Sequence, residues 1–265
     1  MPFTFAHPAA VIPLHWALRR HVVLSALVIG SMAPDFQNFL PFDVDRSDSH
    51  SLAGMFWFCL PLGMLLYLAF HLLLKKPLCE LLPPAVAARL AVTRPAPLLP
   101  SVSGQRILLS LLLGIVTHLA WDAFTHYGFL SVFILPFLST HLFSVGSYHV
   151  YPYKLLQHAS TVGGVLLLWH WTRCWLRQAA MPQQLPPTTL ASRNRLTIIG
   201  ILLAAPPLVG TGMAAQAFSV SYEAMALQDV VREAVVTAIS SFGLLLIAYS
   251  LVWHMFLFQR NRSAT

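Results

Sequence analysis

His118, Asp122 and His126 stand in the segment THLAWDAFTH, directly after the apolar run ILLSLLLGIV. Their spacing of four residues places all three on one face of a helix, with neighbours about 6 Å apart along the axis. Ionisable side chains at membrane depth are costly and usually face a polar interior or a cavity. The segment therefore predicts a polar site inside an otherwise apolar protein.

Other histidine and aspartate residues add to this set and are expected near the same face of the membrane. They are His7, Asp35, His50 and His158. His118 and His126 lie about 12 Å apart along a helix axis, which is too far for a single ion. Asp122 between them can therefore serve one metal or bridge two. The expected cofactor is a divalent metal, most of all zinc, because imidazole and carboxylate groups together suit that ion.

The composition predicts an all-α, polytopic helical membrane protein. The chain of 265 residues is 57% hydrophobic and 9% charged, whereas ordinary soluble domains carry about 25% charged residues. The net charge of +7 does not predict a nucleic-acid partner, because the basic residues stand in loops between apolar runs. The expected partners are membrane lipids, and the expected location is a membrane that the chain crosses several times.

Five apolar runs are long enough to cross a bilayer. They cover residues 51–74, 107–125, 155–171, 196–218 and 234–258. The basic loops at 75–106 and 173–195 are expected in the cytoplasm, together with the C-terminus, under the positive-inside rule. Residues 126–154 then lie on the opposite side, and this aromatic, irregular stretch is expected to hold a short interfacial helix.

The N-terminal part predicts a hairpin of two short helices, 9–18 and 22–31, in place of a full span. Each helix would be about 15 Å long, which is half the hydrocarbon thickness of a bilayer. A turn at Arg19–Arg20 would bring His7 close to Asp35, whereas one straight helix would separate them by about 40 Å.

We expect three parts along the chain: a membrane domain that carries the site (1–172), a basic, proline-rich cytoplasmic linker (173–195) and a C-terminal pair of transmembrane helices (196–265). The three cysteines form no CxxC pair and are expected to be free thiols. Pro34 follows a signal-like apolar stretch and disfavours cleavage there, so residues 1–33 are expected to remain in the mature protein.

Several longer motifs carry a resemblance to a known family: MPFTFAHP at the start, SALVIGSMAPDF at 25–36, SHSLAG at 49–54, THLAWDAFTHYG at 117–128 and YKLLQHASTVGG at 153–164. On these motifs, residues 1–172 resemble an uncharacterised bacterial multi-pass membrane family, one of the domains of unknown function. The resemblance implies a location in the bacterial inner membrane. The order of an N-terminal histidine, GS-x-x-PD, a histidine before a small-residue turn and H-L-x-x-D is also distantly similar to two enzyme groups. These are the predicted inner-membrane metal-dependent hydrolases and zinc-dependent phospholipase C.

The resemblance to these enzymes implies a set of metal ligands. The set is His7, Asp35, His50, His118 and Asp122, with His126 and His158 as further members. The phospholipases complete their sites with a late His-x-x-x-Glu, but Val162 stands at the glutamate position here.

The sequence favours a membrane-embedded, metal-dependent hydrolase that acts on a phosphoester or a lipid headgroup bond. The metal would lower the pKa of a bound water, and Asp122 or Asp35 would act as the general base. Simpler interpretations stay open, with His118 and Asp122 as a buried structural pair and Asp35 as a turn residue. The alternative function is a non-catalytic transporter, metal carrier or scaffold. A third hypothesis is haem held by His118 and His158.

Overall fold

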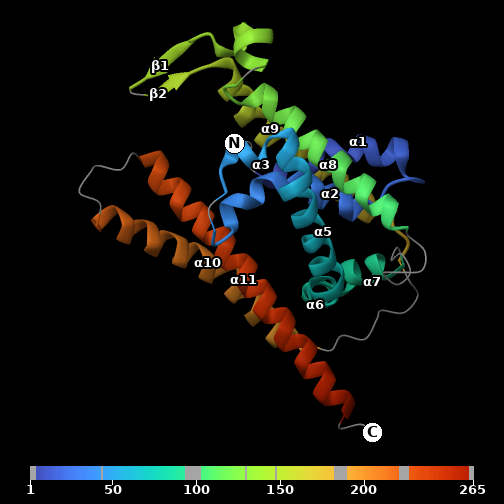
Figure 1. Ribbon diagram of the computed structural model, residues 1–265. Helices are drawn as coiled ribbons and strands as arrows, with labels where there is room; N and C mark the ends of the chain where they lie inside the picture. Colours follow the sequence, from blue (N-terminus) through green and yellow to red (C-terminus); the bar gives the residue numbers. More distant parts are fainter. Residues whose placement is uncertain are drawn as a thin grey trace. The chain divides into compact units, whose positions relative to one another are not determined.

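The computed structural model describes residues 4–42, 44–92, 103–128, 130–146, 148–181, 190–220 and 227–262. Nearly all of these residues lie in helices, as the composition predicts (Figure 1). The chain divides into two compact units. The first contains Met1–Gln37, Val44–Tyr67 and Ala96–Gln178, and the second contains Asn38–Asp43, Leu68–Pro95 and Ala179–Thr265.

The N-terminus forms the predicted hairpin of two short helices. Its elements are the 3-10 helix η1 (Thr4–Ala6), α1 (Pro8–Leu18), α2 (Leu24–Met32) and the 3-10 helix η2 (Ala33–Phe39). Proline at the first position of α1 removes no helical hydrogen bond and fixes a helical φ angle. Val11, Val22 and Leu27 form a buried cluster of the hairpin. Burial of these apolar side chains stabilises the fold-back.

A second segment leads from a short helix, α3 (Arg46–Ser49), into a long apolar helical stretch. The parts of this stretch are α4 (Leu52–Gly54), the π-helix η3 (Met55–Cys59), α5 (Leu60–Ala69), the π-helix η4 (Phe70–Leu74) and α6 (Lys75–Leu81). The first unit contains this stretch as far as Tyr67, and the second contains its remainder. The helix α7 (Pro84–Val92) follows.

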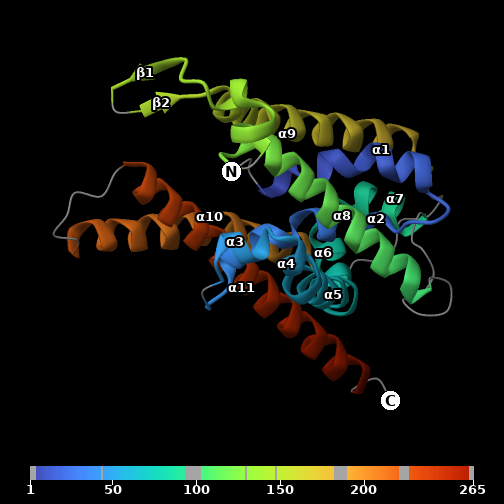
Figure 2. The ribbon, with the colours of Figure 1, turned by 45° about the horizontal axis from the view of Figure 1, so that its top comes forward.

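The helix α8 (Gly104–Thr125) packs along α2 in the first unit (Figure 2). Ala26, Ile107 and Leu111 form a buried core together with Tyr67 of α5. The backbone N–H of Val23, at the N-terminus of α2, donates to Ser110 Oγ of α8 at 2.8 Å. That bond satisfies an amide that has no partner within its own helix.

The stretch between α8 and the next long helix contains two short helices and a β-hairpin. The elements are the π-helix η5 (Leu130–Ile134), the 3-10 helix η6 (Pro136–Ser139), β1 (Phe143–Val145) and β2 (Tyr148–Val150). The strands are antiparallel, with Ser144 opposite His149. Gly146 in the turn has a φ of 59°, which glycine adopts without steric cost. The sequence predicted only a short helix here, because strands of three residues carry little pattern.

Four helical stretches are long and apolar enough to cross a membrane: Leu52–Leu81, Gly104–Thr125, Ser192–Ser219 and Asp229–Arg260. They overlap four of the five predicted spans almost completely and indicate a multi-pass membrane protein. The fifth predicted span, 155–171, lies in α9 (Pro152–Gln178), which has 27 residues but is not among the four stretches found in the described residues. The polar side chains of Gln157, His158 and His170 lower its mean hydropathy.

The second unit contains the C-terminal pair of helices, α10 (Ser192–Val220) and α11 (Leu227–Arg262), which lie side by side (Figure 1). A Cβ atom added at Gly210 would lie 2.2 Å from the carbonyl oxygen of Ala234, so the two backbones approach closely there. The hydroxyl of Tyr249 donates to the carbonyl of Pro77 at 3.0 Å and fastens α11 to α6.

Cys59, Cys79 and Cys174 are free, as predicted. Residues 93–102 of the first basic loop and 182–189 of the expected linker lie outside the described residues. The proposed division at residues 172 and 195 therefore stays a prediction.

Candidate metal centre

Four side chains from three separate segments of the first unit converge on one point. Asp35 comes from η2, His50 from the end of α3, and His118 and Asp122 from one face of α8. One ligand atom of each lies within 4.8 Å of those of the other three. Asp35, His118 and Asp122 are buried, and His50 is half-buried. Such a group of imidazoles and carboxylates can hold a metal ion.

Both imidazoles face the same two carboxylate oxygens, Asp35 Oδ1 and Asp122 Oδ2. His50 Nε2 lies 3.6 Å from the first oxygen and 3.4 Å from the second. His118 Nε2 lies 3.6 Å and 3.5 Å from them. Both Nε2 atoms are buried and make no hydrogen bond in the described part of the chain. An ion between these four atoms would satisfy polar groups that are otherwise costly to bury.

The other nitrogen of each imidazole is engaged, which fixes the orientation of the ring. His118 Nδ1 donates to the carbonyl of Ser31 at 2.8 Å. His50 Nδ1 lies 2.8 Å from Ser49 Oγ, and that hydroxyl donates to Gln37 Oε1 at 2.7 Å. With the ring protons on Nδ1, both Nε2 lone pairs point at the carboxylates. Metal-binding histidines are commonly held in this way.

His7 completes the buried side of the cluster. Its ring stacks on that of His118, with 3.8 Å between the ring centroids. Its Nε2 atom lies 3.7 Å from Asp122 Oδ1. The fold-back of the N-terminal hairpin therefore brings His7 and Asp35 to one site, as predicted. Thr4, which the sequence analysis did not single out, donates its hydroxyl to Asp35 Oδ2 at 2.8 Å.

Local contacts within and near the motif SHSLAG hold His50 in position. Ser51 caps α4 by accepting the backbone N–H of Gly54 at 2.8 Å. A Cβ atom added at Gly54 would lie only 1.8 Å from the carbonyl oxygen of Asp48, so α3 can fold back onto α4 only over a glycine. Cys59 Sγ donates to the carbonyl of Ser49 and fixes the end of α3.

The position of His118 depends on a close contact between α2 and α8. A Cβ atom added at Gly30 would lie 2.3 Å from the carbonyl oxygen of Leu111, and one added at Gly114 would lie 2.3 Å from that of Leu27. Small residues that let helix backbones touch are typical of membrane helix pairs. This contact brings the carbonyl of Ser31 within reach of the His118 ring.

Arg46 is a member of the cluster that the sequence analysis missed. Its Nη2 atom donates to Asp122 Oδ2 at 2.5 Å, and its Nη1 atom lies 3.8 Å from Asp35 Oδ1. The sequence feature that could have identified Arg46 is its position four residues before His50, because this spacing places both residues on one face of a helix.

The charges of the cluster fit a divalent cation. Asp35 and Asp122 bring two negative charges, and Arg46 supplies one positive charge. Burial would raise the pKa of Asp35, but the imidazoles of His50 and His118 beside it and the hydrogen bond from Thr4 outweigh burial and lower that pKa. Burial, with His118 beside it, lowers the pKa of His7 to about 4, so this imidazole is neutral at pH 7. Ionised carboxylates and neutral imidazoles are the forms that bind metal.

His126 and His158, the two further candidates, lie in different surroundings. His126 Nδ1 lies 3.5 Å from Asp122 Oδ1 at the half-exposed edge of the cluster, and burial lowers the pKa of His126 to about 4. His158 is exposed on α9 and is not part of the group that could hold an ion. The buried neighbour Gln157 faces the site in its place, with its Nε2 atom 3.5 Å from His126 Nε2. The structure therefore does not bring His158 to His118, as a shared haem would require.

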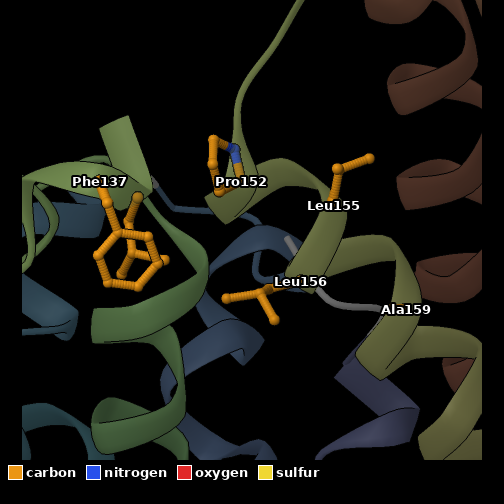
Figure 3. Close-up of a pocket in the computed structure, with 6 residues that line it drawn as sticks. Phe137, Pro152, Leu155, Leu156 and Ala159 are labelled. Atoms are coloured by element: carbon orange, nitrogen blue, oxygen red, sulfur yellow. The ribbon is translucent and has the colours of Figure 1, made fainter. Parts of the chain in front are cut away.

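A separate apolar hollow of about 330 Å³ lies between η6 and the first turns of α9. Its lining consists of Phe137, Leu138, Pro152, Leu155, Leu156 and Ala159. Phe137 and Leu156 face each other across it (Figure 3). None of these side chains is ionisable, so the hollow can hold hydrocarbon but supplies no chemistry.

Candidate membrane spans together with a buried group of histidines and aspartates define a multi-pass helical membrane protein with a candidate metal centre. The chain belongs to the family described as domain of unknown function (DUF4184), whose sequence profile matches residues 1–251. The match extends well past residue 172, where the resemblance seen in the sequence ended. No curated protein matches the chain, and no solved structure matches it.

Proposed function

We propose that the protein is a membrane-embedded, metal-dependent hydrolase that cleaves a phosphoester, with the headgroup bond of a membrane lipid as the expected substrate. The observation that carries the proposal is the convergence of Asp35, His50, His118 and Asp122 within 4.8 Å. It is supported by the hydrogen bonds that orient both imidazoles. Zinc is the expected ion, because its sites combine imidazole and carboxylate ligands.

A bound divalent ion would lower the pKa of a water and polarise the phosphoryl group. The chain's own residues would move the protons. Asp122 Oδ1 points away from the shared pair of oxygens, toward His126 and His7, so it can accept the proton of the attacking water. Asp35, the other candidate base, has Oδ2 engaged by Thr4 and suits a ligand role better.

In this reaction the water oxygen forms a bond to phosphorus, and the bond from phosphorus to the ester oxygen breaks. The water proton passes to Asp122, and the leaving alcohol takes up a proton from it or from solvent. Each step needs a group within hydrogen-bond reach of the substrate. The half-exposed edge formed by His126 and Arg46 is the side from which a headgroup can enter.

The test compares metal content and hydrolysis in two histidine variants. Detergent-purified protein should carry stoichiometric zinc or a related ion and should release phosphate or headgroup from phosphoesters in a chelator-sensitive way. His50→Ala should lose most of the metal and the activity, because it removes one of four ligands. The matched control His158→Ala, an exposed histidine, should keep both.

Three outcomes separate the hypotheses. Wild-type protein that binds no ion under gentle purification removes the metal centre and leaves a buried structural network. Stoichiometric metal without hydrolysis of any phosphoester favours the metal carrier or transporter. Equal loss of metal in His50→Ala and His158→Ala would show that the ligands lie elsewhere.

A further inference from the structure

The guanidinium of Arg46 contacts the same two oxygens that the imidazoles of the site face. Nη2 lies 2.5 Å from Asp122 Oδ2, and Nη1 lies 3.8 Å from Asp35 Oδ1. These are the two oxygens nearest to the Nε2 atoms of His50 and His118. Arg46 and a metal ion at this point would therefore share both carboxylates.

Such sharing is electrostatically unfavourable, because a guanidinium and a divalent cation repel each other strongly at short range in a buried site. The two carboxylates carry two negative charges, which one divalent ion neutralises completely. Once an ion is bound, Asp35 and Asp122 hold the guanidinium of Arg46 less firmly. The positive side chain is then available to another anion.

The guanidinium also has unused hydrogen-bond donors. It carries five N–H groups in a planar fork. Nη1 is buried and makes no hydrogen bond within the described residues, while Nη2 makes one. A planar fork with unused donors matches two oxygens of a phosphoryl group.

The exposure of the cluster points to Arg46 as the first contact for an incoming anion. The Arg46 side chain is 36% exposed, compared with 1% for Asp35 and 6% for Asp122. The side chain lies on α3, a helix of four residues beside the buried ligands. His126 follows with 24% of its side chain exposed, so Arg46 and His126 are the members of the cluster most accessible to an incoming anion.

We propose that Arg46 is the phosphoryl-binding residue of this site and that its guanidinium exchanges between two partners, the pair of carboxylates and the substrate. Without an ion it neutralises Asp35 and Asp122, and with an ion bound it turns to the phosphoryl oxygens. The inference rests on the proposed function, and it narrows the substrate to a phosphomonoester or phosphodiester anion. The anion can belong to a lipid headgroup or to a soluble phosphate.

The first measurement is metal affinity, for which zinc alone is the probe. Arg46→Met removes the competing charge from the carboxylates, so zinc should bind about tenfold more tightly than to wild type. The control Arg20→Met removes an equal charge from an exposed position in the N-terminal hairpin and should leave zinc affinity unchanged. Equal or weaker zinc binding by Arg46→Met would overturn the exchange and leave Arg46 as a structural ion pair.

The second measurement is anion binding to zinc-loaded protein, with inorganic phosphate and with micelles that contain phosphatidic acid as separate probes. Arg46→Met should bind the preferred anion roughly 10- to 100-fold more weakly, because charge-assisted hydrogen bonds are lost. The probe that wild type binds more tightly identifies the source of the phosphoryl group. Unchanged binding of both probes would overturn the anion-binding role.

A conservative variant keeps the proposal testable if Arg46→Met does not fold. Arg46→Lys keeps the charge but loses the fork, so zinc affinity should stay near wild type while phosphate binds several-fold more weakly. Wild-type phosphate affinity in Arg46→Lys would contradict recognition by the planar guanidinium.

Protein that binds zinc and phosphate through Arg46 but cleaves no phosphoester would contradict the proposed hydrolysis alone. Hydrolysis that survives Arg46→Met would remove only the role of Arg46.

Discussion

At the scale of single residues, the site depends on groups that hold the ligands as much as on the ligands. Ser49 connects His50 to Gln37 through two hydrogen bonds. A serine hydroxyl in a short charged helix has no sequence pattern that marks it as a partner of His50. The members of the buried histidine and aspartate cluster were therefore predictable from residue type and spacing, while the residues that orient them were not.

We expect Ser49→Ala to weaken zinc binding by roughly 10- to 100-fold, because the His50 ring loses the contact that fixes its orientation. Isothermal titration or competition with a zinc chelator measures the change. Ser47→Ala, an exposed serine on the same helix, should bind zinc as wild type does. A Ser49→Ala variant with wild-type affinity would show that other contacts orient the ring.

At the scale of elements, the contact between α2 and α8 sets the distance from Ser31 to His118. We expect Gly114→Ala to destabilise the protein by about 1–3 kcal/mol, because its Cβ would meet the backbone of α2. The variant should also bind zinc more weakly, since His118 shifts with α8. Thermal unfolding in detergent and zinc titration test both effects.

The matched control for the helix contact is Gly163→Ala on α9. A Cβ atom there meets nothing within 4 Å, and alanine favours a helix over glycine by up to about 1 kcal/mol. Gly163→Ala should therefore unfold at the same or a higher temperature than wild type. Equal destabilisation by the two substitutions would mean that general glycine loss, and not the α2–α8 contact, limits stability.

At the scale of the whole molecule, the predicted topology depends on whether α9 crosses the membrane. A helix of 27 residues is about 40 Å long, enough to span a bilayer. Val162, Val165 and Leu166 are exposed on it, as side chains that face lipid would be. We therefore expect Val145 and Gln178, which lie before and at the end of α9, to be on opposite sides of the membrane.

Cysteines introduced singly at these two positions, with the native cysteines replaced, test this topology. A membrane-impermeant maleimide should label Val145→Cys in intact cells and Gln178→Cys only after permeabilisation. The basic residues near the end of α9 favour this direction under the positive-inside rule. Labelling of both positions in intact cells would show that α9 does not cross, and labelling of Gln178→Cys alone would invert the orientation.

The sequence by itself determined the class of the protein and most of the histidine and aspartate residues that converge at the candidate site. Its apolar composition and helix-length runs predicted membrane helices, since local hydrophobicity decides burial in lipid. The i, i+4 spacing placed His118 and Asp122 on one face, and the interrupted N-terminal pattern predicted the hairpin that brings in His7. These features are local, so the periodicity of the sequence and its helix-breaking residues are enough to predict them.

Only the tertiary structure decided which candidates meet. His158 and Gln157 are neighbours in sequence, yet Gln157 faces His126 while His158 is exposed. That difference depends on how α9 is rotated against α8, and side-chain type alone does not determine a rotation. Arg46 joins the two aspartates because α3 folds back over Gly54. Contacts between segments far apart in the chain arise from packing, which local patterns do not encode.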